Sequence, residues 1–457
     1  MQGRLLIFLS LAWTVALEAL SWVELQGMNE DAALRKTLKQ LRVEDRGAAV
    51  EASELLYAVS SRKNALDYLI NGALEPGNVD GLDVGLRSFL RLYAYIVHYG
   101  DGPGAEAHRF AEHVRGVLGR KVFKAVEEAI DLIPLQKIPW RSLSHVEAMA
   151  YENFLPTWFV EYVCATFDEG IASDLMSPIE TPKYIRVNTL WGGESPIHGL
   201  EALDFKFEAV PGIRHAYQVL GSSTGLTDTA PYREGGFILQ DKASMLVGEV
   251  AAPGPGDVVL DICAAPGVKT SHLAQLMGNR GRIVSVDVNA GRLASWERLM
   301  ERMGVTIAEP VLGDALKADG LPDVAANVVL LDPPCSGTGT LNGIPSTKWK
   351  ITRASIDEYA ALQGRLIENA VTHVKPGGVL VYSTCSVTVE ENEGVVVGFL
   401  REHPRFRLVE ATTKLGASGL RGLAEAQRLI PKRHACEGFF IAKLVADTPI
   451  DGALHSP

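Results

Sequence analysis

The stretch DVVLDICAAPGVKTSHLAQLMGNRGRIVSVDVN, residues 257–289, decides the fold. It passes from a short apolar run through a turn of small residues into a helical pattern and ends in a second apolar run. The same order recurs around ANVVLLDPP at 326–334 and GGVLVYSTCS at 377–386. Alternating strands and helices are typical of a doubly wound parallel sheet. The sequence therefore predicts an α/β domain over residues 241–445.

The reactive residues of this domain follow its predicted strands. In a doubly wound sheet, ligands bind beyond the carboxyl ends of the strands. The residues at such ends are Asp261, Asp287, Asp314, Asp332, Cys335 and Cys385. We therefore expect one site at this edge of the sheet.

Two regions with different sequence patterns precede the α/β domain. Residues 28–150 repeat apolar residues at spacings of three and four, which predicts an all-helical domain. Residues 151–240 combine a helix with short β-rich runs, which predicts a small α+β subdomain. In its run RVNTL, Arg186 and Asn188 share one side of a strand, and we expect that side to face solvent. Residues 446–457 form a tail.

The first 27 residues contain an apolar run after Arg4 that resembles a signal-peptide core. The run has no small-x-small cleavage site, and Glu18 interrupts it too early for a membrane span of about 20 residues. The favoured interpretation is a start codon assigned too early, with Met28 as the usual opening. A helix that packs on the body and a true signal are the alternatives.

The composition limits the class of protein and its partners. The net charge of −11 argues mildly against a protein coated in nucleic acid, although it does not describe any single cleft. The five cysteines are scattered without a CxxC pair, so neither a disulfide framework nor a zinc site is indicated. We expect a cytoplasmic monomer without a metal and without stable membrane association.

The turn after the first strand has the features of a cofactor loop. Its small residues allow a ligand to approach the backbone, and the following helix offers free N–H groups. Asp287 ends the second strand, where an acid can bind ribose hydroxyls, and Asp314 can meet an adenine amino group or cap a helix. S-adenosylmethionine and another nucleotide both fit this pattern.

The chemistry is indicated by Asp332-Pro333-Pro334-Cys335, where many amine methyltransferases have an aromatic residue in the last position. A thiol there points to a carbon target. The C5 atom of a pyrimidine becomes nucleophilic when a thiolate adds to C6, and a second group can help to expel the adduct. Asp332 can hold or protonate the base at N3 while charge develops. The residues alone do not show whether Cys335 or Cys385 is the attacking group. The alternative interpretation is that both cysteines only fill space in the protein core.

The chain resembles the RNA cytosine-C5 methyltransferases of the Sun/Fmu group over residues 150–445. The resemblance rests on seven motifs: RVNTL, LQDKASML, DICAAPGVKT, VDVNAGRL, LDPPCSGTGT, YSTCSVTVEENE and CEGFFIAKL. It implies the Rossmann-like sheet of class I methyltransferases and S-adenosylmethionine as the cofactor. Two departures, Val268 in the first-strand motif and Glu437 where the family usually has Asp, leave the reacting groups intact.

The resemblance also implies roles for individual residues. Cys385 corresponds to the cysteine that attacks C6, and Cys335 to the one that assists product release. Lys269 lies near the reacting base, where it can serve substrate or cofactor. The implied cofactor residues are Cys263, Ala264, Ala265, Pro266, Gly267, Val268, Lys269, Asp287, Arg292, Asp314 and Asp332.

The substrate class follows from the same likeness. The run DRGAAVEASELLYAVSSRKNALDYLI faintly resembles the NusB-like RNA-binding domain of the ribosomal-RNA members, which favours ribosomal RNA and leaves transfer RNA open. The target cytosine must be unstacked to admit a thiol to C6. The rival interpretations are a methyltransferase acting on DNA or a small molecule, and a non-catalytic RNA-binding assembly factor.

Overall fold

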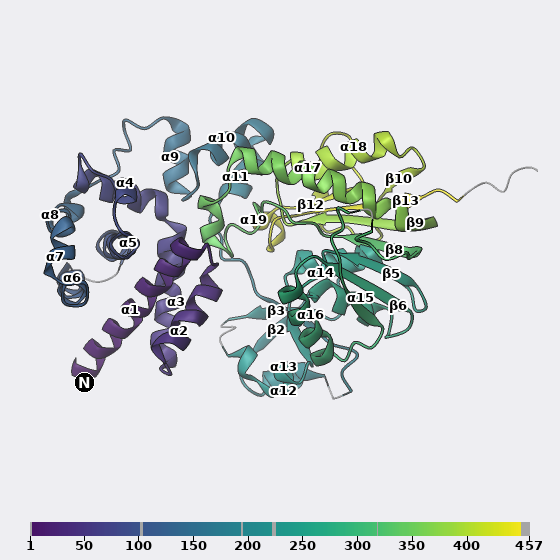
Figure 1. Ribbon diagram of the computed structural model, residues 1–457, viewed down its shortest axis with the longest axis horizontal. Helices are drawn as coiled ribbons and strands as arrows, with labels where there is room; N and C mark the ends of the chain where they lie inside the picture. Colours follow the sequence, from purple (N-terminus) through teal and green to yellow (C-terminus); the bar gives the residue numbers. More distant parts are fainter. Residues whose placement is uncertain (1, 101–103, 193–194, 222–224, 318, 449–457) are drawn as a thin grey trace, which may run out of the picture. The chain divides into compact units, whose positions relative to one another are not determined.

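The computed structural model describes residues 2–100, 104–192, 195–221, 225–317 and 319–448. The chain forms two compact units. Unit 1 comprises residues 1–178 with 341–350, and unit 2 comprises residues 179–340 with 351–457 (Figure 1).

Unit 1 is helical. Its α-helices are α1 Gln2–Gln26, α2 Glu30–Leu41, α3 Arg46–Ser61, α4 Lys63–Leu74, α5 Val84–Tyr99, α6 Gly104–Leu118, α7 Arg120–Phe123, α8 Glu127–Leu132, α9 His145–Glu152, α10 Thr157–Thr166 and α11 Glu169–Met176. Side-chain caps fix the starts of several of them: Asn29 accepts from Ala32 N–H at 2.8 Å, and Asp45 accepts from Ala48 N–H at 3.0 Å. Such caps satisfy backbone donors that the first turn of a helix leaves free.

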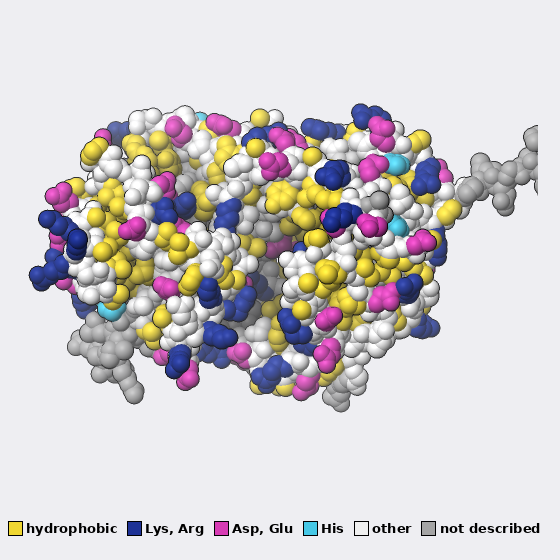
Figure 2. Space-filling model, in the orientation of Figure 1, with side chains coloured by type: hydrophobic (Ala, Val, Ile, Leu, Met, Phe, Trp, Pro, Cys, Tyr) yellow, Lys and Arg dark blue, Asp and Glu magenta, His cyan; other side chains and the backbone are white. Residues whose placement is uncertain are grey.

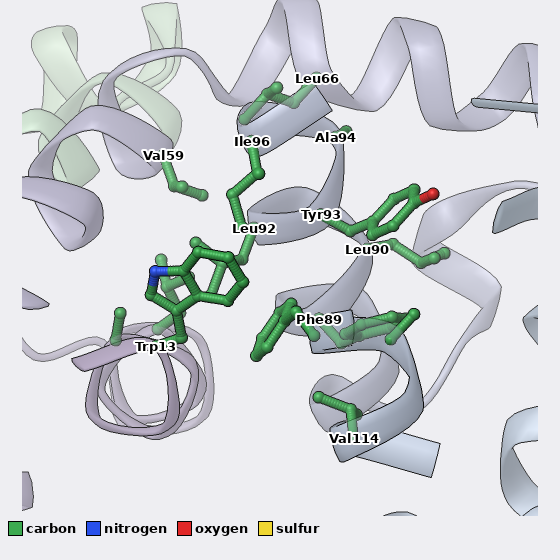
Figure 3. Packing of buried hydrophobic residues seen from close by; sticks show 14 of the residues in the cluster. Trp13, Val59, Leu66, Phe89, Leu90, Leu92, Tyr93, Ala94, Ile96 and Val114 are labelled. Carbon is green, nitrogen blue, oxygen red and sulfur yellow. The ribbon is translucent and has the colours of Figure 1, made fainter. Parts of the chain in front are cut away.

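Helix α1 is part of the core of unit 1. In residues 11–26, where its side chains are described, the buried ones are Ala12, Trp13, Val15, Ala16, Ala19, Leu20 and Val23. Trp13 meets Phe110 edge to face with ring centroids 4.9 Å apart, and it lies near Phe89 and Leu92 in the close view (Figure 3). Among the described residues, no helix is both long and apolar enough to cross a membrane. The helix α1 thus packs on the other helices of unit 1, which was one of the alternative interpretations of the first 27 residues. The start of the mature chain at Met28 stays a prediction.

The segment Leu341–Lys350 belongs to unit 1 although it follows a strand of unit 2 in the sequence. Its short helix η5, Pro345–Trp349, contacts α3. The buried carboxylate of Glu30 accepts from Ser346 N–H at 2.7 Å and from its hydroxyl at 3.2 Å. Trp349 Nε1 donates to Ser60 O at 2.6 Å. A part of the chain distant in sequence therefore completes the helical unit.

Unit 2 contains the predicted doubly wound sheet. The strands are β5 Val258–Ile262, β6 Arg282–Asp287, β7 Ala308–Leu312, β8 Ala326–Leu331, β9 Val374–Thr384, β10 Phe406–Val409, β11 Ala417–Ser418, β12 Gln427–Leu429 and β13 Phe439–Ala446. Their order is β11-β12-β13-β9-β8-β5-β6-β7, with β10 paired to β13. The pairs from β9 to β7 are parallel, and β13 is antiparallel to β9. The α/β prediction is confirmed.

Helices cover both faces of this sheet (Figure 1). The covering helices are α14 Lys242–Ala251, α15 Val268–Leu276, α16 Ala290–Arg302, α17 Arg353–Ala370 and α18 Val395–Glu402. Alternate residues of one strand enter different cores: Leu260 and Ile262 pack with residues of α17 and α18, whereas Val259 packs with residues of α14 and α15. Strands buried on both faces read as continuous apolar runs, which is why the sequence predicted them.

The small subdomain is a four-stranded antiparallel sheet with the order β2-β3-β1-β4. Its strands are β1 Tyr184–Val187, β2 Lys206–Ala209, β3 Ala216–Leu220 and β4 Phe237–Leu239. The expectation that Arg186 and Asn188 face solvent is wrong, because they are 0% and 3% exposed. Arg186 donates to Gln240 at 2.8 Å, to Ser271 at 2.7 Å and to Gln275. These bonds attach the small sheet to α15.

The division into units differs from the expected boundaries at 150 and 240. Helices α10 and α11 belong to unit 1, because α10 packs on α9 and α11 packs on α10. The small sheet belongs with the large sheet in unit 2, through contacts such as those of Arg186. The Leu341–Lys350 segment is the third difference.

Candidate active site

Two cysteine thiols meet at the carboxyl edge of the large sheet. Cys335 follows β8 and Cys385 follows β9, and these strands are parallel neighbours. Their loops therefore leave the sheet side by side, and the two Sγ atoms lie 3.2 Å apart. Both side chains are partly buried. Two residues that are fifty positions apart in sequence thus form one reactive pair.

A buried carboxylate holds both cysteine loops. Glu391, 0% exposed, accepts from the N–H of Ser336 at 2.8 Å and from the hydroxyl of Ser386 at 2.7 Å. It also accepts from the Ser336 hydroxyl, from Thr388 Oγ1 at 2.9 Å and from Gln363 Nε2 at 3.0 Å. Ser336 and Ser386 directly follow the two cysteines. Five donors on one carboxylate fix the positions from which the thiols project.

Asp332 and Lys269 form an ion pair beside the thiols. Lys269 Nζ lies 2.7 Å from Asp332 Oδ2, and Ser383 Oγ donates to Asp332 Oδ1 at 2.9 Å. Burial is the largest single influence on Lys269 and lowers its pKa, but the charge and hydrogen bond of Asp332, together with Cys385 and Asp261, raise the pKa above its usual value. Lys269 therefore stays cationic near the reacting sulfurs.

The free site holds Cys385 as a thiol. The hydrogen bond with Cys335 is the largest influence, burial is the next, and the negative charges of Asp332 and Glu437 add to them. Together they raise the pKa of Cys385 well above the usual value. An attack by this sulfur therefore requires a group that removes its proton.

The cofactor half lies at the ends of β5, β6 and β7. The Asp287 carboxylate accepts from Ala265 N–H at 3.2 Å and Asn289 N–H at 2.9 Å, and Arg292 lies 3.4 Å from it. Gly267 has φ 101°, and a Cβ there would lie 2.7 Å from the Trp296 ring. A side chain at this position would thus be strained and would clash, so the turn needs glycine.

A cavity of about 300 Å³ adjoins these residues. Its lining is Cys263, Val286, Asp287, Val288, Arg292, Gly313, Asp314, Ala315, Leu316, Pro334, Leu362 and Leu366. Carboxylates at one end and apolar walls elsewhere suit a nucleoside, with ribose hydroxyls at Asp287 and a base between apolar side chains. Cys263, Asp287, Arg292 and Asp314 of the predicted cofactor residues line this cavity.

The other predicted cofactor residues lie in the loop itself or at the thiols. Ala264, Ala265 and Gly267 are buried, Val268 is half-buried and Pro266 is exposed. Lys269 and Asp332 lie on the side of Cys385, as their ion pair and the charge effects on Cys385 show. Asp314 also accepts from Leu316 N–H at 3.1 Å, so the turn-capping role is present as well.

Comparisons with known proteins agree with this geometry. The 16S rRNA methyltransferase RsmB/F family matches residues 249–445. A probable ribosomal RNA small subunit methyltransferase B of Synechocystis is 30% identical over 413 residues, which cover 86% of this chain and 90% of that protein. The chain belongs to the RsmB/F family. It is accordingly an RNA cytosine-C5 methyltransferase.

Solved structures support the family assignment. The crystal structure of PH0851 has a TM-score of 0.85 and 29% identity, and the match covers 95% of this chain and 98% of that one. NSun6 from Pyrococcus horikoshii with SFG has a TM-score of 0.57 and 27% identity, covering 64% of this chain and 98% of that one. RsmB/F membership implies S-adenosylmethionine, and the cavity beside Asp287 is suited to it.

Sequence reasoning missed the residues that position the thiols. Glu391 and Gln363 were not singled out, although both are 0% exposed. A signal was present for Glu391, because the acid run EENE follows directly on the apolar and hydroxyl residues after Cys385. Gln363 lies within an ordinary helical pattern, so the sequence holds no comparable signal for it.

Proposed function

We propose that this enzyme methylates C5 of a cytosine in small-subunit ribosomal RNA, with Cys385 as the nucleophile. The observation that carries the proposal is the pair of sulfurs 3.2 Å apart beside the Asp332–Lys269 ion pair. The Synechocystis relative, of which the match covers 90%, supports ribosomal RNA as the substrate. The helical unit is the proposed RNA-binding domain.

In the proposed reaction, the Cys385 sulfur adds to C6 of a cytosine that has left its stack. The ring electrons move toward N3, where Asp332 holds or protonates the base and Lys269 keeps positive charge nearby. S-adenosylmethionine, when bound, supplies the methyl group that C5 takes. Ser383 keeps the Asp332 carboxylate oriented through its 2.9 Å hydrogen bond.

Cys335 is the proposed release group. After methyl transfer, a base takes the C5 proton, the C5–H electron pair re-forms the C5–C6 double bond, and the C6–S bond breaks with its electron pair returning to sulfur. The Cys335 sulfur lies within hydrogen-bond distance of the Cys385 sulfur, so it is near the bond that breaks. Removal of Cys335 should therefore leave the RNA attached to Cys385.

The cofactor is proposed to lie in the cavity at the ends of β5, β6 and β7. Asp287 would bind the ribose hydroxyls, with Arg292 and the Ala265 N–H holding the carboxylate in place. The loop 263–269 would approach the amino-acid end, because its small residues Ala264, Ala265 and Gly267 let a ligand come close to the backbone. Asp314 would face the adenine side.

The face drawn in Figure 2 shows no patch made of Lys and Arg side chains alone that would mark an RNA-binding surface. Lys/Arg and Asp/Glu side chains are interspersed there with apolar ones. Residues 401–443 hold nine Lys/Arg against four Asp/Glu and could form a local basic surface. Arg401, Arg405 and Arg407 are exposed there, whereas Arg428 is buried in an ion pair with Glu393. That segment therefore offers fewer free cations to RNA than its composition suggests.

The test is a trapped adduct on a denaturing gel. Wild type, Cys335→Ala and Cys385→Ala are incubated with S-adenosylmethionine and unmodified small-subunit rRNA, transfer RNA or DNA. We expect a slow-migrating protein–RNA band with Cys335→Ala and rRNA, and none with Cys385→Ala. A band with transfer RNA alone would reassign the substrate. The reverse cysteine pattern would make Cys335 the nucleophile, and no methyl transfer by wild type to any nucleic acid would overturn the proposal.

A further inference from the structure

The proposed attack leaves the proton of the Cys385 thiol without a destination. The acids around the thiols are already engaged: Asp332 binds Lys269 and Ser383, and Glu391 accepts five hydrogen bonds from the cysteine loops and Gln363. Glu437 is the remaining acid whose charge acts on Cys385. It lies just before β13, which pairs with β9.

Backbone hydrogen bonds hold the Glu437 segment against both cysteine loops. Gly438 N–H donates to Gly339 O at 2.8 Å, and Gly339 N–H donates to Cys385 O at 2.8 Å. A Cβ on Gly438 would lie 2.8 Å from Gly339 Cα, so the backbones are in direct contact. In the adjoining sheet, Phe440 pairs with Thr384, the residue before Cys385. The residues that directly follow Glu437 are therefore held against the segment that carries the nucleophile.

The carboxylate of Glu437 is available to a reacting group. Among the contacts of the described residues, no side-chain hydrogen bond ends on it, and the side chain is partly exposed. Its backbone N–H donates to Asp241 Oδ2 at 3.3 Å, while Asp241 Oδ1 accepts from Ala243 N–H at 2.8 Å. Asp241 thus caps α14 and anchors Glu437, and it is not free to serve the thiol.

We propose that Glu437 is the catalytic base that accepts the Cys385 thiol proton as the sulfur attacks C6; this inference rests on the proposed function. The S–H bond breaks and its proton passes to a Glu437 carboxylate oxygen, directly or through one water. The sulfur electron pair forms the S–C6 bond, and the ring pair moves toward N3. When the C6–S bond breaks later, its electron pair returns to sulfur and Glu437 gives the proton back.

The electrostatics of Glu437 suit this role. Burial and the neighbouring Asp241 raise the pKa of Glu437 to about 7, while Lys269 and Lys183 act in the opposite direction. A general base is most effective when its pKa lies near the working pH. The charged and titratable groups that face Glu437 are Asp241, Lys183, Lys269, Cys385 and Cys436.

The experiment measures adduct formation in a single turnover as a function of pH. Full-length Cys335→Ala enzyme, which should accumulate the adduct, is the parent, and Glu437→Gln and Glu437→Asp are made in it. The Gln variant keeps the shape of the side chain and cannot accept the proton. We expect its adduct rate at pH 7 to fall about 100-fold, in the range typical of general-base catalysis.

The pH profile separates a base from a positioning role. The parent rate should level off above about pH 7, where Glu437 is ionised. The rate of the Gln variant should instead keep rising about tenfold per pH unit above pH 7, because it must wait for direct ionisation of Cys385, whose pKa burial still raises when Cys335 is absent. Glu437→Asp should restore the plateau at a lower rate, since the acid is retained with a shorter reach.

The control is Glu425→Gln, an exposed acid of the same unit, which should leave the adduct rate unchanged. Unchanged melting temperature and cofactor affinity of the Gln variant would confirm its fold, and the Asp variant tests the base if the Gln variant fails to fold. A Gln variant whose rate and pH profile match the parent would overturn the inference, as would a uniform loss without a change of profile. If the parent itself forms no adduct, it is the proposed function that fails.

Discussion

The sulfur atoms of Cys335 and Cys385 lie 3.2 Å apart at the ends of two parallel neighbouring strands. A disulfide bond needs about 2.05 Å between sulfurs. Small side-chain rotations would therefore join them. Because the same two thiols are the proposed nucleophile and release group, their oxidation should abolish both roles at once.

Treatment with hydrogen peroxide should form this disulfide and stop methyl transfer. Two thiols and one peroxide give one disulfide and two waters, and a dithiol should restore activity. Peptide mass analysis under non-reducing conditions should find the 335 and 385 peptides linked. The exposed Cys164 serves as the control thiol, because blocking it should leave activity intact. Irreversible loss of activity without a 335–385 link would count against this pairing.

Replacement of Glu391 by Ala should disable catalysis and destabilise unit 2. It would leave several buried donors without an acceptor, each worth about 1–3 kcal/mol. We expect a loss of unfolding free energy on the order of 3 kcal/mol or more and a fall in kcat, measured by denaturant titration and by single-turnover methylation. Glu390→Ala is the matched control, because its ion pair with Arg353 is partly exposed and should contribute about 1 kcal/mol or less.

Replacement of Asp287 by Ala should weaken cofactor binding without affecting RNA binding. A lost hydrogen bond to a charged group is worth about 1.5–3 kcal/mol, which corresponds to roughly a tenfold to hundredfold rise in Kd. Calorimetry with S-adenosylhomocysteine and a gel shift with RNA would measure the two affinities. Asp323→Ala, an exposed acid of the same unit, should change neither. An unchanged Kd in Asp287→Ala would place the cofactor elsewhere.

A chain started at Met28 should have an unstable helical unit. It lacks α1, whose described part buries side chains such as Trp13 and Leu20, and truncation of a buried Trp costs about 3–5 kcal/mol by itself. Total stabilities of domains are only about 5–15 kcal/mol. Limited proteolysis and thermal melting would compare the shortened chain, Trp13→Ala and Trp140→Ala. Trp140 is 49% exposed, so its variant should behave like wild type. Equal protease resistance of the shortened chain would support Met28 as a workable start.

The large sheet could be predicted because its information is local. The strands β5, β6, β8 and β9 are apolar on both faces, and each runs directly into a loop with reactive residues. Parallel pairing then brings the ends of β8 and β9 together, so Cys335 and Cys385 were placed correctly at one edge. Their 3.2 Å separation could not be predicted, because it depends on the bonds of Glu391.

The burial of Arg186 and the extent of the helical unit could not be predicted, because both depend on contacts between residues that are distant in the sequence. Arg186 reads as a surface residue because a charged side chain is seldom buried without partners. Its hydrogen-bond partners Gln240, Ser271 and Gln275 lie 54 to 89 positions away in the sequence. The residues next to Arg186 in the sequence therefore do not predict these partners. The division after residue 178 has a similar cause, since packing rather than a change of composition joins α10 and α11 to unit 1.

The placement of the Leu341–Lys350 segment constrains the order of events on the ribosome. Glu30 is synthesised early, but the Ser346 donors that satisfy its buried carboxylate emerge 316 residues later. Until then, a nascent helical unit carries a carboxylate that is desolvated without partners or stays open to water. The helical unit therefore reaches its final packing only after β8 and the Cys335 loop have left the exit tunnel. Folding of the first unit is completed by translation of the second.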